Sequence, residues 1–193
     1  MIDLPDFDAL YRRDPDPWNV RSSFYEQRKL SIVLACLQRS RYRFAWDPAC
    51  GVGELAAELV TRSERVLASD ASAEAVRLTR QRGAGLTGLE IRRLALPDVP
   101  PAPPRGFDLV VLSEFLYYLP AADRAATLAA LATVVGEDAE VLSVHWRHHP
   151  HDAWLSGADV ESEVVDGLVE LGWRHRFRHD DRDFVVDGLE RGR

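Results

Sequence analysis

Lysine is almost absent from this 193-residue chain: Lys29 is the only one, and arginine carries nearly all of the positive charge. We attribute this bias to genome composition rather than to function. The formal net charge of -7 argues against binding nucleic acid through overall charge. The apolar runs are too short to span a bilayer, and the acidic N-terminus lacks the apolar region of a signal peptide. The sequence therefore predicts neither a nucleic-acid partner nor a membrane partner.

Cysteine is also scarce. Cys36 and Cys50 lie far apart, and neither belongs to a CxxC pair or a disulfide framework. This usage is typical of a reducing compartment, so we expect a cytoplasmic protein. The length suits one core, which predicts a single domain over residues 1–193.

Short apolar runs alternate with amphipathic stretches along most of the chain. We expect strands at 43–48, 65–70, 89–94, 107–112 and 140–146, with helices at 25–39, 54–62, 73–82, 121–135 and 159–171. Two further strands, at 173–179 and 183–189, are expected to close the chain as a hairpin. This alternation predicts an α/β sandwich with a mostly parallel sheet, helices on both faces, and one antiparallel strand from the hairpin.

Residues 1–24 show no clear periodicity and are expected to form an arm. Prolines at 15 and 17 block helix propagation in its second half. We expect Phe24 to pin the arm to the core. For Trp18 and Tyr25, a role as a lid over a cofactor and simple anchoring are equally favoured.

A glycine-rich turn follows the first expected strand and is the main candidate for a ligand-binding site. Gly51 and Gly53 lack a Cβ, so the backbone there can turn sharply and approach a ligand closely. Residues 51–56 fit G-x-G-x-x-A, which leaves open an NAD-dependent reductase with Asp70 on the ribose. However, Asp47 stands at the strand end, where its charge would oppose a pyrophosphate. A carboxylate here favours a ligand with a cationic head.

The segment Asp47-Pro48-Ala49-Cys50-Gly51-Val52-Gly53 resembles the first motif of the class I S-adenosylmethionine-dependent methyltransferases, although Ala49 stands where the family usually has glycine. Asp70 matches the second motif, an acid ending strand two that grips both ribose hydroxyls, and Ala71 follows it. Ser113 and Glu114 end the fourth-strand motif and are expected to line the cofactor pocket. The resemblance implies a Rossmann-like, seven-stranded methyltransferase fold with S-adenosylmethionine as cofactor.

The same resemblance places the adenine near Ala95 and Leu96. The family often has an acid or amide at this place, so here we expect backbone and apolar contacts to hold the base. Glu114 or Asp47 is expected to offset the positive charge of the cofactor.

A narrower resemblance concerns the acceptor. The segments Asp16-Pro17-Trp18, Tyr25-Glu26, 113–119 and His145-Trp146-Arg147 look like the nodulation-protein-S group of small sugar methyltransferases. This resemblance implies methyl transfer to a hydroxyl or amine of a saccharide, in polysaccharide biosynthesis. Tyr117, Trp146 and Arg147 are then expected to shape the acceptor pocket.

Residues 145–152 hold most of the chain's histidines. His145 ends the fifth expected strand, at the sheet edge where substrates sit, and its near-neutral ordinary pKa suits a general base. The simplest interpretation of the remaining residues is a solvated polar loop. No zinc spacing is present and we assign no metal ligand, but a divalent ion such as magnesium, held together with a sugar hydroxyl, is an alternative.

Two further alternatives stay open at this point: an N-methyltransferase of another small amine, and a non-catalytic module that keeps only a cofactor pocket. The sequence leaves open the acceptor's identity, oxygen or nitrogen attack, and the oligomeric state.

Overall fold

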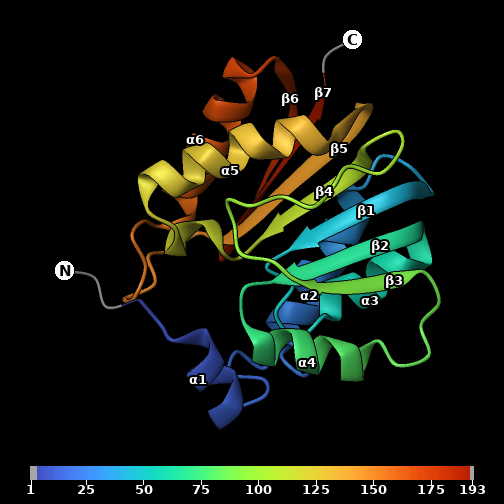
Figure 1. The fold of residues 1–193 in the computed structure, drawn as a ribbon. Helices are drawn as coiled ribbons and strands as arrows, with labels where there is room; N and C mark the ends of the chain where they lie inside the picture. The colour runs from blue at the N-terminus through green and yellow to red at the C-terminus, as the bar shows by residue number, and fades with distance from the viewer. Residues whose placement is uncertain (1–3, 192–193) are drawn as a thin grey trace. The chain divides into compact units, whose positions relative to one another are not determined.

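The computed structural model describes residues 4–191. Its seven strands have the sheet order β3-β2-β1-β4-β5-β7-β6 (Figure 1). Strand β7 runs antiparallel to both β5 and β6, whereas the pairs β1–β2, β2–β3 and β4–β5 are parallel. The expected seven-stranded, mostly parallel sheet with one antiparallel strand is therefore confirmed. The chain divides into two compact units, described separately below: an N-terminal unit of residues 5–95, and a C-terminal unit of Leu4 and residues 96–191.

The N-terminal unit contains three parallel strands with helices between them. Its elements are α1 (Phe7–Arg13), α2 (Phe24–Cys36), β1 (Tyr42–Pro48), α3 (Glu54–Arg62), β2 (Ser63–Asp70), α4 (Ala73–Arg82) and β3 (Leu89–Arg93). Ala56 and Leu59 bury one side of α3, which begins and ends where the sequence predicts. Helix α4 has the expected bounds: Ser72 caps it by accepting a hydrogen bond from the Ala75 N–H, and Gly83 ends it.

The arm differs from its expected form. A short helix, α1, occupies residues that show no clear periodicity in sequence, and Asp6 caps it by accepting from the Ala9 N–H. Phe24 begins α2 with 79% of its surface exposed, so the expectation that it anchors the arm is wrong. Tyr11 anchors the arm instead, because it is buried against Val52 and Leu78.

The C-terminal unit contains the strand order β4-β5-β7-β6. Its elements are β4 (Phe107–Ser113), the 3-10 turn η1 (Leu116–Tyr118), α5 (Ala121–Val134), β5 (Val135–Trp146), α6 (Gly157–Glu170), β6 (Trp173–Asp180) and β7 (Phe184–Arg191). Residues 107–112 are all buried, which explains the continuous apolar run in β4. The expected closing hairpin is present as β6 and β7.

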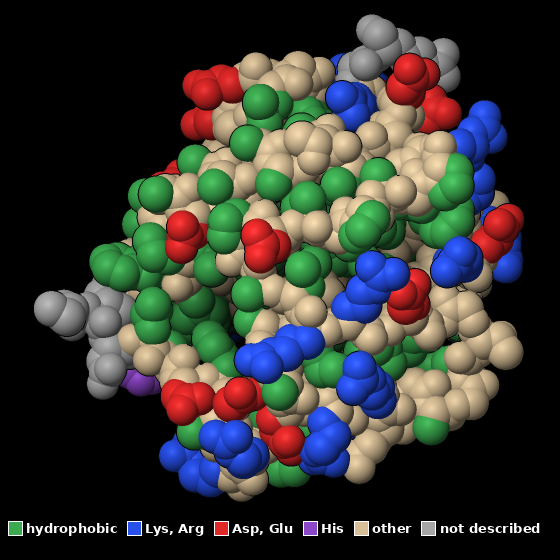
Figure 2. All heavy atoms as spheres, in the orientation of Figure 1, with side chains coloured by type: hydrophobic (Ala, Val, Ile, Leu, Met, Phe, Trp, Pro, Cys, Tyr) green, Lys and Arg blue, Asp and Glu red, His purple; other side chains and the backbone are tan. Residues whose placement is uncertain are grey.

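In each unit, side chains of one kind gather over one helix (Figure 2). Hydrophobic side chains gather over α5, whereas Lys and Arg side chains gather around α4, which contributes Arg77, Arg80 and Arg82 (Figure 2). Within residues 4–191, no helix combines the length and the apolar character needed to cross a membrane.

Candidate active site

The glycine-rich turn between β1 and α3 has the backbone that the sequence suggests. Gly51 and Gly53 have φ values of +54° and +81°. A Cβ on Gly51 would lie 2.9 Å from the Tyr11 hydroxyl, and one on Gly53 would lie 2.7 Å from the Thr79 methyl carbon. Ala49 also has a positive φ, 55°, so the departure from glycine at this position places an alanine in the left-handed region.

Thr79 fixes this turn from α4. Its hydroxyl donates to the Gly51 carbonyl over 2.7 Å, and the Cys50 N–H donates to the Ser69 carbonyl of β2. Sequence reasoning missed Thr79 because a threonine inside an amphipathic helix carries no signal of a contact this distant along the chain.

Asp47 and Asp70 end two neighbouring parallel strands. Asp70 is 9% exposed, and its carboxylate accepts hydrogen bonds from the Gly51 N–H at 2.9 Å and the Ser72 N–H at 2.8 Å. Asp47 is 1% exposed, and the Ala56 backbone lowers its pKa, against the larger effect of burial. Among the described residues, its Oδ2 has no hydrogen-bond partner.

Burial raises the pKa of both carboxyl groups, and the charge of Asp70 raises the pKa of Asp47 further. The two acids therefore lie close enough to repel one another. A buried carboxylate oxygen without a donor, beside a second carboxylate, has chemistry complementary to a cation. The residues present thus fit a sulfonium nucleoside, which brings positive charge and ribose hydroxyls that donate to a carboxylate.

The arm lies over the turn within the same unit. The rings of Tyr11 and Trp18 meet edge to face at 5.7 Å, and Trp18 remains 42% exposed. Tyr25 is half-buried under the Lys29 ammonium, which lies 4.9 Å from its ring centre. Lys29 itself is 7% exposed and paired with Glu26, so it does not face water, although a lysine beside the apolar stripe of an amphipathic helix is ordinarily solvent-facing.

The remaining cofactor candidates are less enclosed. Ala71 and Ala95 are exposed and Leu96 is half-buried. The Ala71 carbonyl accepts a hydrogen bond from the Arg93 guanidinium. Their contacts with adenine stay a prediction.

In the C-terminal unit, Glu114 follows β4 with a positive φ of 61°. Its N–H donates to the Val144 carbonyl, and its Oε2 accepts from the Tyr117 hydroxyl at 2.7 Å and the Trp146 N–H at 2.9 Å. Glu114 and the preceding Ser113 are both half-buried. A non-glycine residue held in this backbone region is typical of a functional position, because the neighbouring contacts must offset its strain.

His145 is fully buried at the end of β5. Its Nδ1 lies 2.7 Å from Glu161 Oε1, and its Nε2 accepts from the Leu116 N–H at 3.3 Å. Ser143 donates to the same Glu161 oxygen at 3.0 Å. Sequence reasoning missed Ser143 and Glu161, although a serine inside an apolar strand is a usable signal of a buried polar partner.

The expected acceptor residues have different surroundings. Trp146 is 36% exposed, and its ring centre lies 5.0 Å from that of His148. Tyr117 is buried and packs edge to face against His145 at 5.2 Å. Arg147 donates to the Asp181 carbonyl at 2.6 Å, so its guanidinium supports the turn between β6 and β7.

The histidine-rich loop does not converge on one point. The His149 ring bonds the Ala153 carbonyl, whereas the His148 ring lies 3.8 Å from the Asp183 carboxylate. In residues 4–191, no three His, Cys, Asp or Glu side chains are grouped as metal ligands would be. The structure therefore adds no support to the magnesium alternative.

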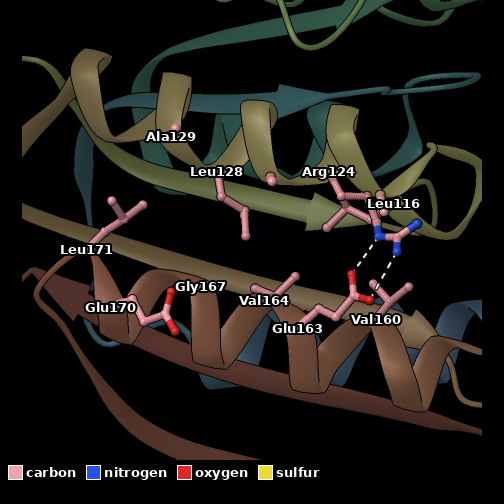
Figure 3. A pocket seen from close by; sticks show the side chains of 12 residues that line it. Leu116, Arg124, Leu128, Ala129, Val160, Glu163, Val164, Gly167, Glu170 and Leu171 are labelled. Carbon is pink, nitrogen blue, oxygen red and sulfur yellow. Dashed lines mark hydrogen bonds and ion pairs between the residues drawn. The ribbon is translucent and has the colours of Figure 1, made fainter.

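A cavity of about 240 Å³ lies between α5 and α6. Figure 3 shows Leu128 and Val164 facing it, with the Arg124–Glu163 ion pair at one end. None of the expected site residues lines this cavity, so we do not assign it to the active site.

Comparison with known proteins agrees with this geometry. The family model described as a methyltransferase domain matches residues 45–138. A candidate methyltransferase from Pseudomonas syringae, known from a crystal structure, is 34% identical in sequence to this chain. The two structures match with a TM-score of 0.74, over 88% of this chain and 100% of that one.

Two relatives belong to the nodulation group. Nodulation protein S of Bradyrhizobium diazoefficiens is 24% identical over 83% of this chain and 78% of its own length. The N-methyltransferase NodS of Bradyrhizobium japonicum, in complex with S-adenosyl-L-homocysteine, has a TM-score of 0.83 at 16% identity, covering 98% of this chain and 100% of that one.

The fold and the paired acids beside a glycine turn define an α/β nucleoside-binding protein. The chain belongs to the class I S-adenosylmethionine-dependent methyltransferases and resembles the nodulation-protein-S group. It is thus an enzyme that uses S-adenosylmethionine, and the reductase alternative drawn from G-x-G-x-x-A is set aside.

Proposed function

We propose that this protein transfers the methyl group of S-adenosylmethionine to a hydroxyl or amine of a saccharide, in polysaccharide biosynthesis. The observation that supports the acceptor class is Trp146, the last residue of β5, whose aromatic side chain is 36% exposed and whose backbone N–H donates to the Glu114 carboxylate. An aromatic face suits the apolar C–H face of a sugar ring, and a carboxylate suits its hydroxyl or ammonium groups. The similarity to nodulation protein S supports the same class.

The sulfonium makes the methyl group electrophilic, so the main task of the protein is alignment of nucleophile, methyl carbon and sulfur. In the N-terminal unit, Asp70 would hold the ribose hydroxyls and Asp47 would face the positive charge, while Gly51 and Gly53 let the cofactor approach the backbone. Trp18 and Tyr25 would cover it from the arm. In the C-terminal unit, Tyr117 and Trp146 would border the acceptor.

The attacking group must lose a proton. A general-base role for His145 stays a prediction from the sequence; in the present conformation both ring nitrogens are hydrogen-bonded and the ring is fully buried. Such a role therefore requires the Leu116 N–H to leave Nε2. Glu114, which is half-buried, is the second candidate for proton acceptor.

A screen of neutral and amino mono- and oligosaccharides with radiolabelled cofactor, with and without magnesium, tests the proposal. We expect label in at least one saccharide, and mass spectrometry of the product distinguishes oxygen from nitrogen attack. Transfer only to non-sugar amines would favour the alternative amine acceptor. Tight binding of S-adenosylhomocysteine with no transfer to any acceptor would favour the non-catalytic module.

The predicted cytoplasmic location rests on cysteine usage, and both Cys36 and Cys50 are free thiols in the structure. We retain it as part of the proposal.

A further inference from the structure

A buried polar chain surrounds His145 in the C-terminal unit, and the function proposed so far gives its other members no role. Ser143 and His145 of β5, Glu161 of α6 and Asp187 of β7 are each 0% exposed. They connect β5, α6 and β7, and His145 links them to the turn η1 through the Leu116 N–H. Burying four polar side chains in one core is costly unless each has a hydrogen-bond partner, so each of them should have one.

The proton positions follow from the partners. Glu161 Oε1 accepts from the Ser143 hydroxyl and lies 2.7 Å from His145 Nδ1, which must carry hydrogen to bond it. His145 Nε2 lies 3.3 Å from the Leu116 N–H, which can only donate, so Nε2 carries none. The histidine is therefore the neutral Nδ1–H tautomer, fixed from both sides.

The surroundings of Glu161 Oε2 indicate that this oxygen carries the proton of the carboxyl group. Glu161 Oε2 is buried without a donor among the described residues, and the Glu161 carboxyl lies within hydrogen-bonding reach of Asp187. Burial, with the Asp187 charge, raises the pKa of Glu161 well above its ordinary value. A protonated Oε2 donating to Asp187 satisfies both groups. On its far side, Asp187 is paired with Arg178 at 2.8 Å and with the His175 ring at 2.7 Å.

The chain ends on the backbone of η1. Leu116 follows Glu114 by two residues, and Tyr117, next in sequence, donates its hydroxyl to Glu114 Oε2. Glu114 is held at a positive φ, so its position depends on contacts from outside its own backbone. His145 bonds the backbone of the same turn, through the Leu116 N–H two residues after Glu114.

We propose that Glu161 and His145 are positioning residues: Glu161 fixes the tautomer of His145, and His145 Nε2 holds the turn that presents Glu114 and Tyr117. This inference rests on the proposed function, because it concerns how the same methyl transfer is supported. It differs from the general-base prediction, since here His145 acts through the backbone and exchanges no proton with the acceptor.

Three variants separate the two roles. Glu161→Gln keeps an acceptor oxygen and a donor toward Asp187, so we expect near-normal turnover. Glu161→Met removes both and should lower kcat roughly 10- to 100-fold, with the affinity for S-adenosylhomocysteine unchanged, as loss of a partner that orients a histidine typically does. Glu170→Met makes the same change at an exposed position of α6 and is the matched control.

His145→Gln is the decisive variant. The glutamine oxygen can replace Nε2 as acceptor for the Leu116 N–H but cannot act as a base. We expect it to retain most of the turnover that His145→Ala loses, with the pH profile of the native enzyme. If His145→Gln is as inactive as His145→Ala while Glu161→Met remains fully active, His145 acts as the base and the proposal is overturned.

A measurement on the native protein keeps the inference testable if a variant does not fold, and separates it from the proposed function. Nitrogen NMR of the histidine rings should show His145 with a protonated Nδ1 and a hydrogen-bonded, unprotonated Nε2, whether or not any saccharide is methylated. A protonated Nε2 would refute the inference even in an active methyltransferase. The expected tautomer in a protein that methylates no saccharide would refute only the proposed function.

Discussion

At the scale of single residues, Asp47 and Asp70 carry the cofactor assignment. Both also lie beside the start of a helix: the Ala56 backbone in the first turn of α3 lowers the pKa of Asp47, and Asp70 accepts from the Ser72 N–H before α4. Capping alone, however, does not require burial of a carboxylate oxygen without a partner. Asp47 therefore costs stability in the absence of ligand, which is a property of binding residues rather than of caps.

Asp47→Asn separates these two roles. Asparagine keeps an oxygen that can face the Ala56 backbone, while the buried charge is lost. We expect the ligand-free variant to be more stable than the native protein, yet to bind S-adenosylmethionine roughly 10- to 100-fold more weakly, because a charge-assisted contact is removed. Thermal denaturation and calorimetry measure the two effects. A variant that loses stability and keeps its affinity would identify Asp47 as a cap only.

The stability of the ligand-free protein and its affinity for the cofactor should change with pH in opposite directions. Because folding raises the pKa of Asp47, the folded state binds more protons than the unfolded state, so ligand-free stability should fall as the pH rises through the folded pKa. Cofactor affinity should move the opposite way, since the cation favours the ionised carboxylate. Calorimetric titration with S-adenosylmethionine over a pH series should show affinity increasing with pH in the native protein, and a flatter dependence in Asp47→Asn.

The backbone at Gly53 requires glycine. Its φ of +81° and its closeness to Thr79 both exclude a side chain. We expect Gly53→Ala to lower the free energy of unfolding by about 2 kcal/mol or more, from backbone strain and overpacking together. Thr79→Ser removes the nearest methyl carbon and keeps the hydroxyl, so the double variant should recover part of the loss in chemical denaturation. Purely additive effects would show that the strain lies in the backbone alone.

At the scale of elements, most of the fold is predictable because its signals are local. Ser72 and Gly83 mark both ends of α4, and the apolar run 107–112 marks β4. The arm is less predictable, because α1 depends on a cap at Asp6 and on burial of Tyr11 against distant residues. The same reason hides Glu161 in the sequence: on its helix it looks like one more acid, and only the fold turns it inward.

The arm is also fixed by hydrogen bonds between α1 and the start of α4. Asp8 of α1 accepts from the Ser72 hydroxyl at 2.5 Å and the Glu74 N–H at 3.1 Å, and these bonds lower its pKa. A lowered folded pKa means that this attachment is complete above the ordinary pKa and is lost as the pH falls through the folded value. We expect Asp8→Ala to release α1, so that limited proteolysis cuts near residues 12–13 faster than in the native protein. Asp6→Ala, which removes the cap but not this attachment, is the control; equal cleavage in both variants would contradict the role of Asp8.

At the scale of the whole molecule, charge is distributed unevenly along the chain. Residues 96–193 contain 18 acidic and 9 basic side chains, whereas residues 5–95 contain 12 and 15. The excess of arginine around α4 in Figure 2 belongs to the second group. The half of the sequence that holds the proposed acceptor residues is thus strongly acidic, which favours the approach of cations.

This asymmetry bears on the choice between oxygen and nitrogen attack. An amino sugar carries a positive charge near neutral pH, so the acidic unit should attract it, and salt should screen that attraction. We expect KM for an amino sugar to rise between low and physiological ionic strength, with kcat nearly constant, while KM for the matching neutral sugar stays the same. Glu114→Gln should weaken this salt dependence if the carboxylate beside Trp146 contacts the ammonium group, and Glu170→Gln, an exposed acid on α6, should change it little. Equal salt dependence for charged and neutral sugars would argue that the acidic surface has no part in acceptor choice, and would leave shape and aromatic contact at Trp146 as its basis.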